Sequence, residues 1–563
     1  MLNKLFLVGI QMKRKYIGVV ICWLLATGTA WAASPIPTFD KEAVTEHVYA
    51  RTGEQDVIHK AGPVDTGYKP GNTGTTEAPA FYVKEIHLSG QDLPKETTGL
   101  TEILAAYSHR SVSVSELEEL TKALTAYYRG QGYTVPQAVI PPQEVKNGIL
   151  EVHIYLAYYD SIQVSSNTSD VADSVIQRYM NRLQPGERMQ DRQLEKALNN
   201  INDLPGVIAR ATLVPGSQPE TTGVSVDVMR RPIWNNYIFT DNGGGYYSGR
   251  WRYGFHTEMN NISYGGDKVI LSGMLTSHDM KNYSVRYETP VGDDGTRWGL
   301  GYSQTTYDFQ MDHTLGNYGR SRGISFYGTT PLYRNRNNRL TAIYGYDHRN
   351  IMNENRYQLP VGNLIFPIRL RTHKEADVYH VGLSGSQYQK DQFIQYNLIY
   401  WYGDISTKER HLYYDGAYHK LTSDILSVWY DGKWNYRLML HGQLGSRGLD
   451  GSEEFYLGGM NGVRAYAASD GYGDYGWQGT YEIRRQTGIK NLEAALFLDG
   501  GGVWNKADDS MEHLYGWGAG LRYNKNNDWN ISLDYAKKMH SRDDKVQPHN
   551  KNGRWWLQVY KMV

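Results

Sequence analysis

Apolar and polar residues alternate along most of residues 231–563. In residues 283–289 (YSVRYET), Tyr and Val fall on one side of an extended chain, whereas Ser, Arg and Glu fall on the other. The same period of two recurs in residues 394–402 and 531–535. This period is typical of a β-strand whose two faces meet different surroundings. We therefore expect antiparallel strands joined by polar turns such as residues 292–295.

The two faces of these strands suit lipid on one side and water on the other. An Arg on the lipid side near the bilayer centre costs roughly 2–4 kcal/mol, so charges confined to one side of each strand favour a transmembrane barrel. A soluble antiparallel sandwich also alternates, but it does not need many Tyr and Trp residues near strand ends, where membrane barrels have aromatic girdles. At roughly 10 residues per tilted strand plus connections, residues 231–563 allow a number of strands in the middle teens. We expect a transmembrane β-barrel of 16 antiparallel strands.

Residues 81–157 combine strand and helix patterns. Residues 81–88 form a strand-like run, and Ser115 with Glu118 makes a capping box at the start of a helix that ends near Gly130. Two further runs alternate like strands, in residues 134–140 and 149–156. The order strand, helix, helix, strand, strand predicts a compact α+β domain.

Residues 158–230 repeat this plan. A strand is expected at 161–165, and helices are expected near 171–183 and 191–201, the second with Leu194, Ala197, Leu198 and Ile201 on its buried face. Two strands follow, at 207–214 and 224–229. The repetition is visible in the order of elements more than in the residues themselves, and it predicts two tandem copies of one small fold.

The first 80 residues read as three segments. Residues 1–32 have a basic stretch, an apolar run and the small-residue site Ala30-Trp31-Ala32, which is the pattern of a secretory signal peptide. Met12, which opens the basic stretch, is a second candidate for the start codon. Within residues 33–60 a short helix over Thr38–Arg51 and an irregular terminus are both compatible with the pattern. Residues 61–80 read as a Gly/Pro/Thr linker.

Composition narrows the possible functions. A chain of 563 residues is longer than one hydrophobic core usually organises, so several domains are expected. Lys plus Arg and Asp plus Glu both number 59, a balance that argues against a nucleic-acid partner. The single cysteine, Cys22, lies in the predicted signal peptide, which excludes a disulfide scaffold, a cysteine-based zinc site and a cysteine nucleophile from the mature chain. No G-x-S-x-G, H-E-x-x-H or Walker motif is present, so we expect neither an enzyme nor a cofactor.

Four motif blocks resemble a known family, the outer-membrane transporters of two-partner secretion, which export filamentous haemagglutinins, haemolysins and contact-dependent inhibition toxins. Two blocks are similar to polypeptide-transport-associated (POTRA) domains. The first, in residues 127–150, includes Gly132, Tyr133, Pro141, Gln143 and Gly148, and the second, in residues 194–216, includes Leu204, Pro205 and Gly206. The resemblance implies POTRA domains at 81–157 and 158–230, before a barrel at 231–563.

The third and fourth blocks lie in the predicted barrel. The third contains Gly462, Val463, Arg464, Ala465 and Tyr466, and it is similar to the family's V-R-G-[YF] motif on a loop folded back into the barrel. The fourth, Phe497-Leu498-Asp499-Gly500-Gly501, is similar to the F-x-D-G motif of the barrel wall. The resemblance implies that Arg464 and Asp499 pair as a lock between loop and barrel. The chain departs from the family pattern at Ala465, where Gly is usual, and at Val563, where Phe is commoner.

The resemblance also implies a function and partners. We expect periplasmic POTRA domains to bind an unfolded, large exoprotein with an N-terminal two-partner secretion domain and the barrel to secrete it without ATP, the 33–60 helix acting as a pore plug. Other expected partners are outer-membrane lipid and, during biogenesis, periplasmic chaperones and the barrel assembly machinery. Two alternatives remain: a BamA-type assembly factor, although that class typically has more POTRA copies, and a substrate-gated porin, which would not need residues 81–230.

Overall fold

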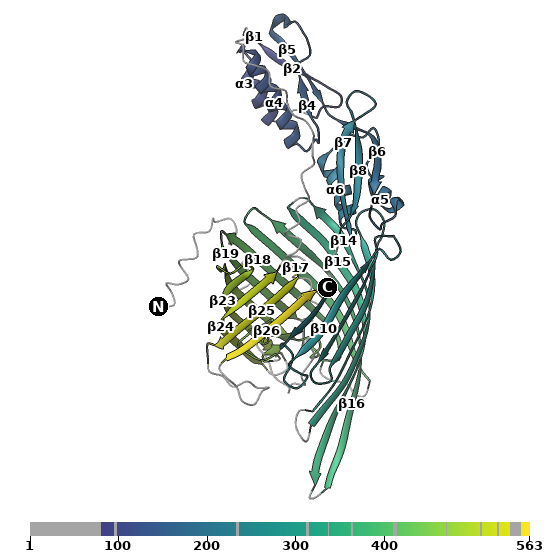
Figure 1. Ribbon diagram of the computed structural model, residues 1–563, viewed down its shortest axis with the longest axis vertical. Helices are drawn as coiled ribbons and strands as arrows, with labels where there is room; N and C mark the ends of the chain where they lie inside the picture. Colours follow the sequence, from purple (N-terminus) through teal and green to yellow (C-terminus); the bar gives the residue numbers. More distant parts are fainter. Residues whose placement is uncertain are drawn as a thin grey trace.

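The computed structural model describes residues 80–563 except for gaps at 95–97, 232–235, 311–314, 336, 362–363, 409–413, 469, 507–508, 526–527 and 541–552. The predicted signal peptide, the predicted plug helix and all but the last residue of the predicted linker lie outside the described residues. Two small α+β units are stacked at one end of a large barrel, and a long hairpin containing β16 projects from the other end (Figure 1).

The first unit is built around helix α4. Its elements are β1 (Phe81–Val83), β2 (Glu85–Ser89), α3 (Thr98–Tyr107), β3 (Arg110–Val112), α4 (Val114–Gly130), β4 (Gln137–Val139), the 3-10 turn η2 (Lys146–Gly148) and β5 (Ile149–Tyr155). The main sheet has the order β2-β5-β4, with β2 parallel to β5. The strand predicted at 81–88 is in fact two strands, because β1 pairs with β3 and β2 pairs with β5.

The predicted capping box at Ser115 and Glu118 was wrong by two residues. Helix α4 is capped by Ser113, whose backbone N–H donates to the Glu116 carboxylate at 2.7 Å. Both Ser/Glu pairs have the same spacing, but Arg110 contacts Glu116 at 2.6 Å and so favours the earlier cap. Hydrogen bonds from Arg110 and Ser113 lower the pKa of Glu116 to about 2.

The second unit has the same order of elements as the prediction. They are β6 (Tyr158–Asn167), α5 (Asp173–Met180), α6 (Asp191–Asn202), β7 (Val207–Pro215) and β8 (Thr221–Arg230). The sheet order is β6-β8-β7, again with one parallel and one antiparallel pair. Leu194, Ala197 and Ile201 are buried as predicted, whereas Leu198 is partly buried at the margin of the core.

The barrel is closed and consists of 16 antiparallel strands, as predicted. Its strands are β9 (Tyr237–Asp241), β10 (Arg252–Asn260), β11 (Lys268–Thr276), β12 (Lys281–Pro290), β13 (Arg297–Gln310), β14 (Leu315–Arg334), β15 (Asn338–Val361), β16 (Leu364–Tyr388), β17 (Gln392–Thr407), β18 (Gly416–Asp431), β19 (Trp434–Gly445), β22 (Tyr475–Gln486), β23 (Leu492–Asn505), β24 (Ser510–Lys525), β25 (Trp529–Lys538) and β26 (Gly553–Met562). The last strand closes the ring against β9.

The predicted alternation matches the two faces of the wall. On β12, Tyr283, Val285 and Tyr287 are exposed on the outer face, whereas Ser284, Arg286 and Glu288 are more shielded. This arrangement puts apolar side chains toward lipid and charges toward the lumen. In the part of the chain that the structure describes, no helix is both long and apolar enough to cross a membrane.

Candidate functional site: a loop anchored inside the barrel

The connection between β19 and β22, residues 446–474, is folded into a compact, buried loop. It contains a short hairpin of β20 (Phe455–Tyr456) and β21 (Tyr472–Gly473). The segment that connects these two strands includes Val463 and Ala465. Both residues are fully buried and belong to an apolar cluster with wall residues that include Phe497 and Leu514. The predicted Gly462 fits here for a steric reason, since a Cβ at this position would lie 2.0 Å from the carbonyl oxygen of Leu457.

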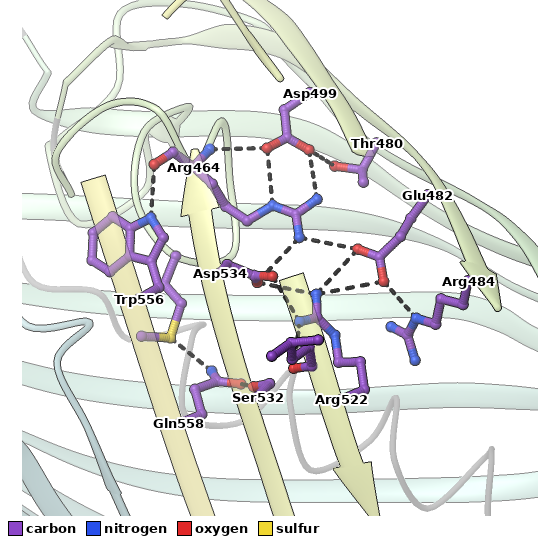
Figure 2. Close-up of polar contacts among 12 residues, drawn as sticks. Arg464, Thr480, Glu482, Arg484, Asp499, Arg522, Ser532, Asp534, Trp556 and Gln558 are labelled. Atoms are coloured by element: carbon purple, nitrogen blue, oxygen red, sulfur yellow. Dashed lines mark hydrogen bonds and ion pairs between the residues drawn. The ribbon is translucent and has the colours of Figure 1, made fainter. Parts of the chain in front are cut away.

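The structure brings Arg464 and Asp499 together in a bidentate contact (Figure 2). The Arg464 Nε and Nη2 atoms donate to the two carboxylate oxygens of Asp499 at 2.9 and 2.8 Å. The backbone N–H of Arg464 donates to the same carboxylate at 3.1 Å, and so does the Thr480 hydroxyl, at 2.9 Å. Because both side chains are almost completely buried, solvent screens this pair little.

Arg464 has two further acidic partners that the sequence did not predict. Its Nη1 atom contacts Glu482 on β22 at 3.0 Å and Asp534 on β25 at 3.3 Å. These carboxylates also bind Arg522, and Glu482 binds Arg484 as well. Three arginines therefore face three carboxylates, and the cluster is balanced in charge. Figure 2 shows this network around the Arg464 guanidinium.

Two aromatic side chains complete the surroundings of Arg464. The guanidinium carbon lies 3.3 Å from the centroid of the Phe497 ring, the predicted wall residue, in a cation–π contact. The indole N–H of Trp556 on β26 donates to the backbone carbonyl of Arg464 at 2.7 Å. The loop motif is therefore in contact with five wall strands, β22 to β26, through Arg464 and its neighbours. Trp556 could not be predicted as part of this site, because its position beside the loop depends on the register of the strands.

The other loop and wall residues of the predicted site have separate roles. Tyr466 is buried, and the Nζ atom of Lys538 lies 4.7 Å from its ring centroid. Gly500 faces Tyr515 of the neighbouring strand, which would lie 2.9 Å from an added Cβ. Its neighbour Gly501 does make room for the loop, since a Cβ there would lie 2.5 Å from the Leu457 side chain.

The residues of the first POTRA signature fall into two places. Gly132 and Tyr133 lie at the joint between the two units, where the Asp191 N–H donates to the Gly132 carbonyl at 3.0 Å. Arg188 there donates to the Tyr133 hydroxyl at 3.3 Å. The remaining signature residues shape a turn beside β5. The Gln143 amide forms hydrogen bonds of 2.7 and 2.8 Å with the Glu151 backbone and one of 3.3 Å with the carbonyl of Pro141, and Gly148 has φ +77°.

The second signature lies where the second unit meets the barrel. Asn261, in the β10–β11 turn, donates to the Pro205 carbonyl at 2.7 Å, and Leu204 packs against Gly266 of the same turn. Gly206 accepts a hydrogen bond from the Arg231 backbone at 2.8 Å. Beside this motif, Asp203 pairs with Arg334 and Arg339, which flank the β14–β15 turn. The second signature thus lies at a joint of the molecule, as do Gly132 and Tyr133 of the first.

The arrangement of barrel, buried loop and stacked α+β units can be compared with known proteins. The family model described as haemolysin secretion/activation protein ShlB/FhaC/HecB matches residues 220–523, more than half of the chain. The chain belongs to this family. Residues 81–155 match the POTRA domain of the ShlB type. The protein is therefore an outer-membrane β-barrel transporter, and its POTRA end lies in the periplasm.

Individual relatives cover nearly the same span. The heme/hemopexin transporter protein HuxB of Haemophilus influenzae strain 86-028NP is 25% identical over 495 residues, which are 83% of this chain and 84% of HuxB. The outer membrane transporter CdiB of Dickeya dadantii strain 3937 is 22% identical over 546 residues, which are 90% of this chain and 91% of that protein.

Solved structures share the fold at lower identity. CdiB from Escherichia coli has a TM-score of 0.72 at 19% identity and covers 94% of this chain and all of its own. BamA from Haemophilus ducreyi lacking POTRA domains 1-3 has a TM-score of 0.50 at 14% identity and covers 86% of this chain and all of its own.

Among the described residues, no group of His, Cys, Asp and Glu side chains could hold a metal ion.

Proposed function

We propose that this transporter secretes a large exoprotein with an N-terminal two-partner secretion domain, which its POTRA domains bind unfolded in the periplasm. The observation that carries the proposal is the combination of a closed barrel, a loop anchored inside it and α+β units joined to its periplasmic end. A porin for small solutes does not need those units. The relatives' names, heme/hemopexin transporter and outer membrane transporter, also favour transport.

The free edge of β2 is the best candidate for exoprotein capture. Among the described residues β2 pairs only with β5, so its other edge is available to another strand. Glu85, His87 and Ser89 are exposed along it. An unfolded segment that adds to such an edge binds through backbone hydrogen bonds, which makes recognition tolerant of side-chain sequence.

The proposal assigns no catalytic activity, cofactor or ATP hydrolysis to the chain. Folding of the exoprotein outside the cell would withdraw the emerging segment from the pore and supply the direction of transport. Insertion of the barrel itself would depend on periplasmic chaperones and the barrel assembly machinery.

The proposal is tested by deleting residues 81–157, the first POTRA domain. Secretion into the medium, measured by comparing exported proteins with and without the transporter gene, should be lost, while heat-modifiable migration on gels shows that the barrel still inserts. Lys122→Ala, an exposed change on α4, serves as the matched control and should secrete normally. Continued secretion by the deletion variant would contradict the proposed capture step.

The likeness to BamA supports one second candidate, an assembly factor for other outer-membrane proteins. That function predicts that depletion of this chain lowers the amounts of unrelated barrel proteins in the outer membrane. We expect those amounts to be unchanged, with only the exported protein lost from the medium.

A further inference from the structure

The start of the loop, residues 449–453, contacts a different arc of the barrel wall from the loop tip. The Leu449 side chain is only 1% exposed. It belongs to an apolar cluster with residues from β16, β17 and β18, namely Ala376, Val378, Ile405 and Tyr418. The carboxylates around Arg464 belong instead to β22, β23 and β25, and β19 separates the two arcs. The loop is therefore attached to the wall at two places.

Buried ion pairs reinforce the attachment at the loop start. Glu453 contacts Arg349 on β15 at 2.5 Å and Lys420 on β18 at 3.0 Å. Asp450 pairs closely with Lys374 on β16. The side chains of all five residues are at most 10% exposed. Buried pairs of this kind are costly to break from one side, because the remaining charge is left without compensation in a poorly hydrated site.

We propose that Leu449, Asp450 and Glu453, with Arg349, Lys374 and Lys420 of the wall, form a base anchor that holds the loop independently of the Arg464 lock. The two attachments share no residue. At the tip, one loop side chain, Arg464, pairs with carboxylates of the wall. At the base, the loop contributes the apolar Leu449 and the carboxylates of Asp450 and Glu453, and the wall contributes the cations. Under this proposal the tip can open while the base stays attached, because the two attachments have separate contacts with the wall.

The backbone between base and tip is shaped for such a motion. Gly459 has φ +113° and Gly471 has φ +72°, and they flank the tip segment that carries Arg464. Residues with a side chain rarely adopt these conformations, and glycine can also leave them at little cost. On the base side, the Leu449 N–H donates to Asp474 at 2.6 Å, which ties the beginning of the loop to its end.

Thiol labelling of the purified full-length protein in detergent micelles tests the proposal. The only native cysteine is Cys22, which lies in the predicted signal peptide, so a Cys22→Ser background leaves one reporter thiol in the protein with or without that segment. Ser452→Cys reports on the base, and Ala467→Cys, at a fully buried position, reports on the tip. The base variant is Asp450→Asn with Glu453→Gln, which keeps the side-chain sizes and removes both charges.

A matched control exists on the same wall strand. Glu375, next to Lys374 on β16, forms an exposed pair with Lys408, so Glu375→Gln removes a charge that the anchor does not use. Exposed pairs contribute little. Labelling at both reporters should stay within about twofold of the parent protein for this control.

The expected result separates the two attachments. The base variant should raise the labelling rate at position 452 by about tenfold, the factor that corresponds to about 1.4 kcal/mol of local stability, and leave position 467 within about twofold. Arg464→Ala should instead raise the labelling rate at position 467 by about 700-fold and leave position 452 within about twofold. Equal effects of the base variant at both positions, or no effect at 452, would overturn the proposal.

Two further measurements keep the test decisive. If the double variant does not give a heat-modifiable barrel, the charge swap Lys374→Asp with Asp450→Lys replaces it. Asp450→Lys alone should then accelerate labelling at position 452, and the swap should restore protection. The labelling results do not depend on the proposed export function, so a loss of secretion with normal labelling would count against neither anchor.

Discussion

Replacing Arg464 by alanine should release the loop tip, and the contacts of Arg464 indicate how much free energy the closed loop would lose. Removing one partner of a buried ion pair typically costs about 3–5 kcal/mol. Without Arg464, the Asp499 carboxylate retains two hydrogen-bond donors in the described part of the chain, the Thr480 hydroxyl and the backbone N–H of residue 464. We therefore expect Arg464→Ala to destabilise the closed loop by about 4 kcal/mol.

Asp499→Ala should be less severe. Arg464 would keep Glu482 and Asp534, so its charge would remain partly compensated. We expect a cost of about 2 kcal/mol. The double variant removes both charges and leaves two arginines facing two carboxylates, so it should be no worse than Arg464→Ala. The coupling energy of the double-mutant cycle is then about 2 kcal/mol, or roughly 30-fold in the opening equilibrium.

The assay is the rate of thiol labelling at Ala467→Cys in the Cys22→Ser background, because this position becomes accessible only when the tip moves. Secretion, measured in parallel, should fall in both single variants while the barrels remain heat-modifiable. Arg485→Ala, an exposed arginine on β22 that stacks on Trp434, is the control and should change labelling by less than about twofold. Strictly additive effects of Arg464→Ala and Asp499→Ala would refute the pairing.

Three further outcomes follow from other parts of the chain. Gly516→Ala should loosen the tip, because the added methyl group would lie 2.7 Å from the Ala465 side chain, and Ala465→Gly in the same protein should restore thiol protection. Asp203→Asn should reduce secretion by weakening the joint between the second unit and the barrel, whereas Asp170→Asn, which breaks a more exposed pair with Arg230, should not. Deleting residues 34–55, which lie outside the described residues, should raise single-channel conductance in planar bilayers if the segment plugs the pore, and unchanged conductance would contradict that role.

The alternation of apolar and polar residues was sufficient to predict the barrel, because the sequence of each strand shows which of its faces meets lipid. The same pattern put Asp534 on the polar side of its strand, but it could not place this residue beside Arg464. That proximity depends on the register of β24 and β25 and on the depth to which the loop enters, and both are properties of several strands together. The Arg464–Asp499 contact was expected only through resemblance to a family motif.

The capping box shows the same limit on a smaller scale. Two Ser/Glu pairs with the required spacing overlap in residues 113–118, and each is locally able to start a helix. The choice is made by Arg110, which precedes the helix and binds Glu116 in the folded unit. A local pattern therefore predicted that a helix begins here, but its first residue was decided by a contact outside the pattern.

Ala465 shows how a departure from a motif is accommodated elsewhere in the chain. From the motif alone, an alanine at the position where the family pattern has glycine suggests a less tightly packed loop tip. In the structure Ala465 is fully buried, and the space for its methyl group is provided by Gly516 on β24. Buried interiors are close-packed, so a group added on one surface requires room on the facing one. The volume that Ala465 adds to the motif is thus accommodated by Gly516, a residue that no motif includes, so the packing of the loop has to be considered together with the wall.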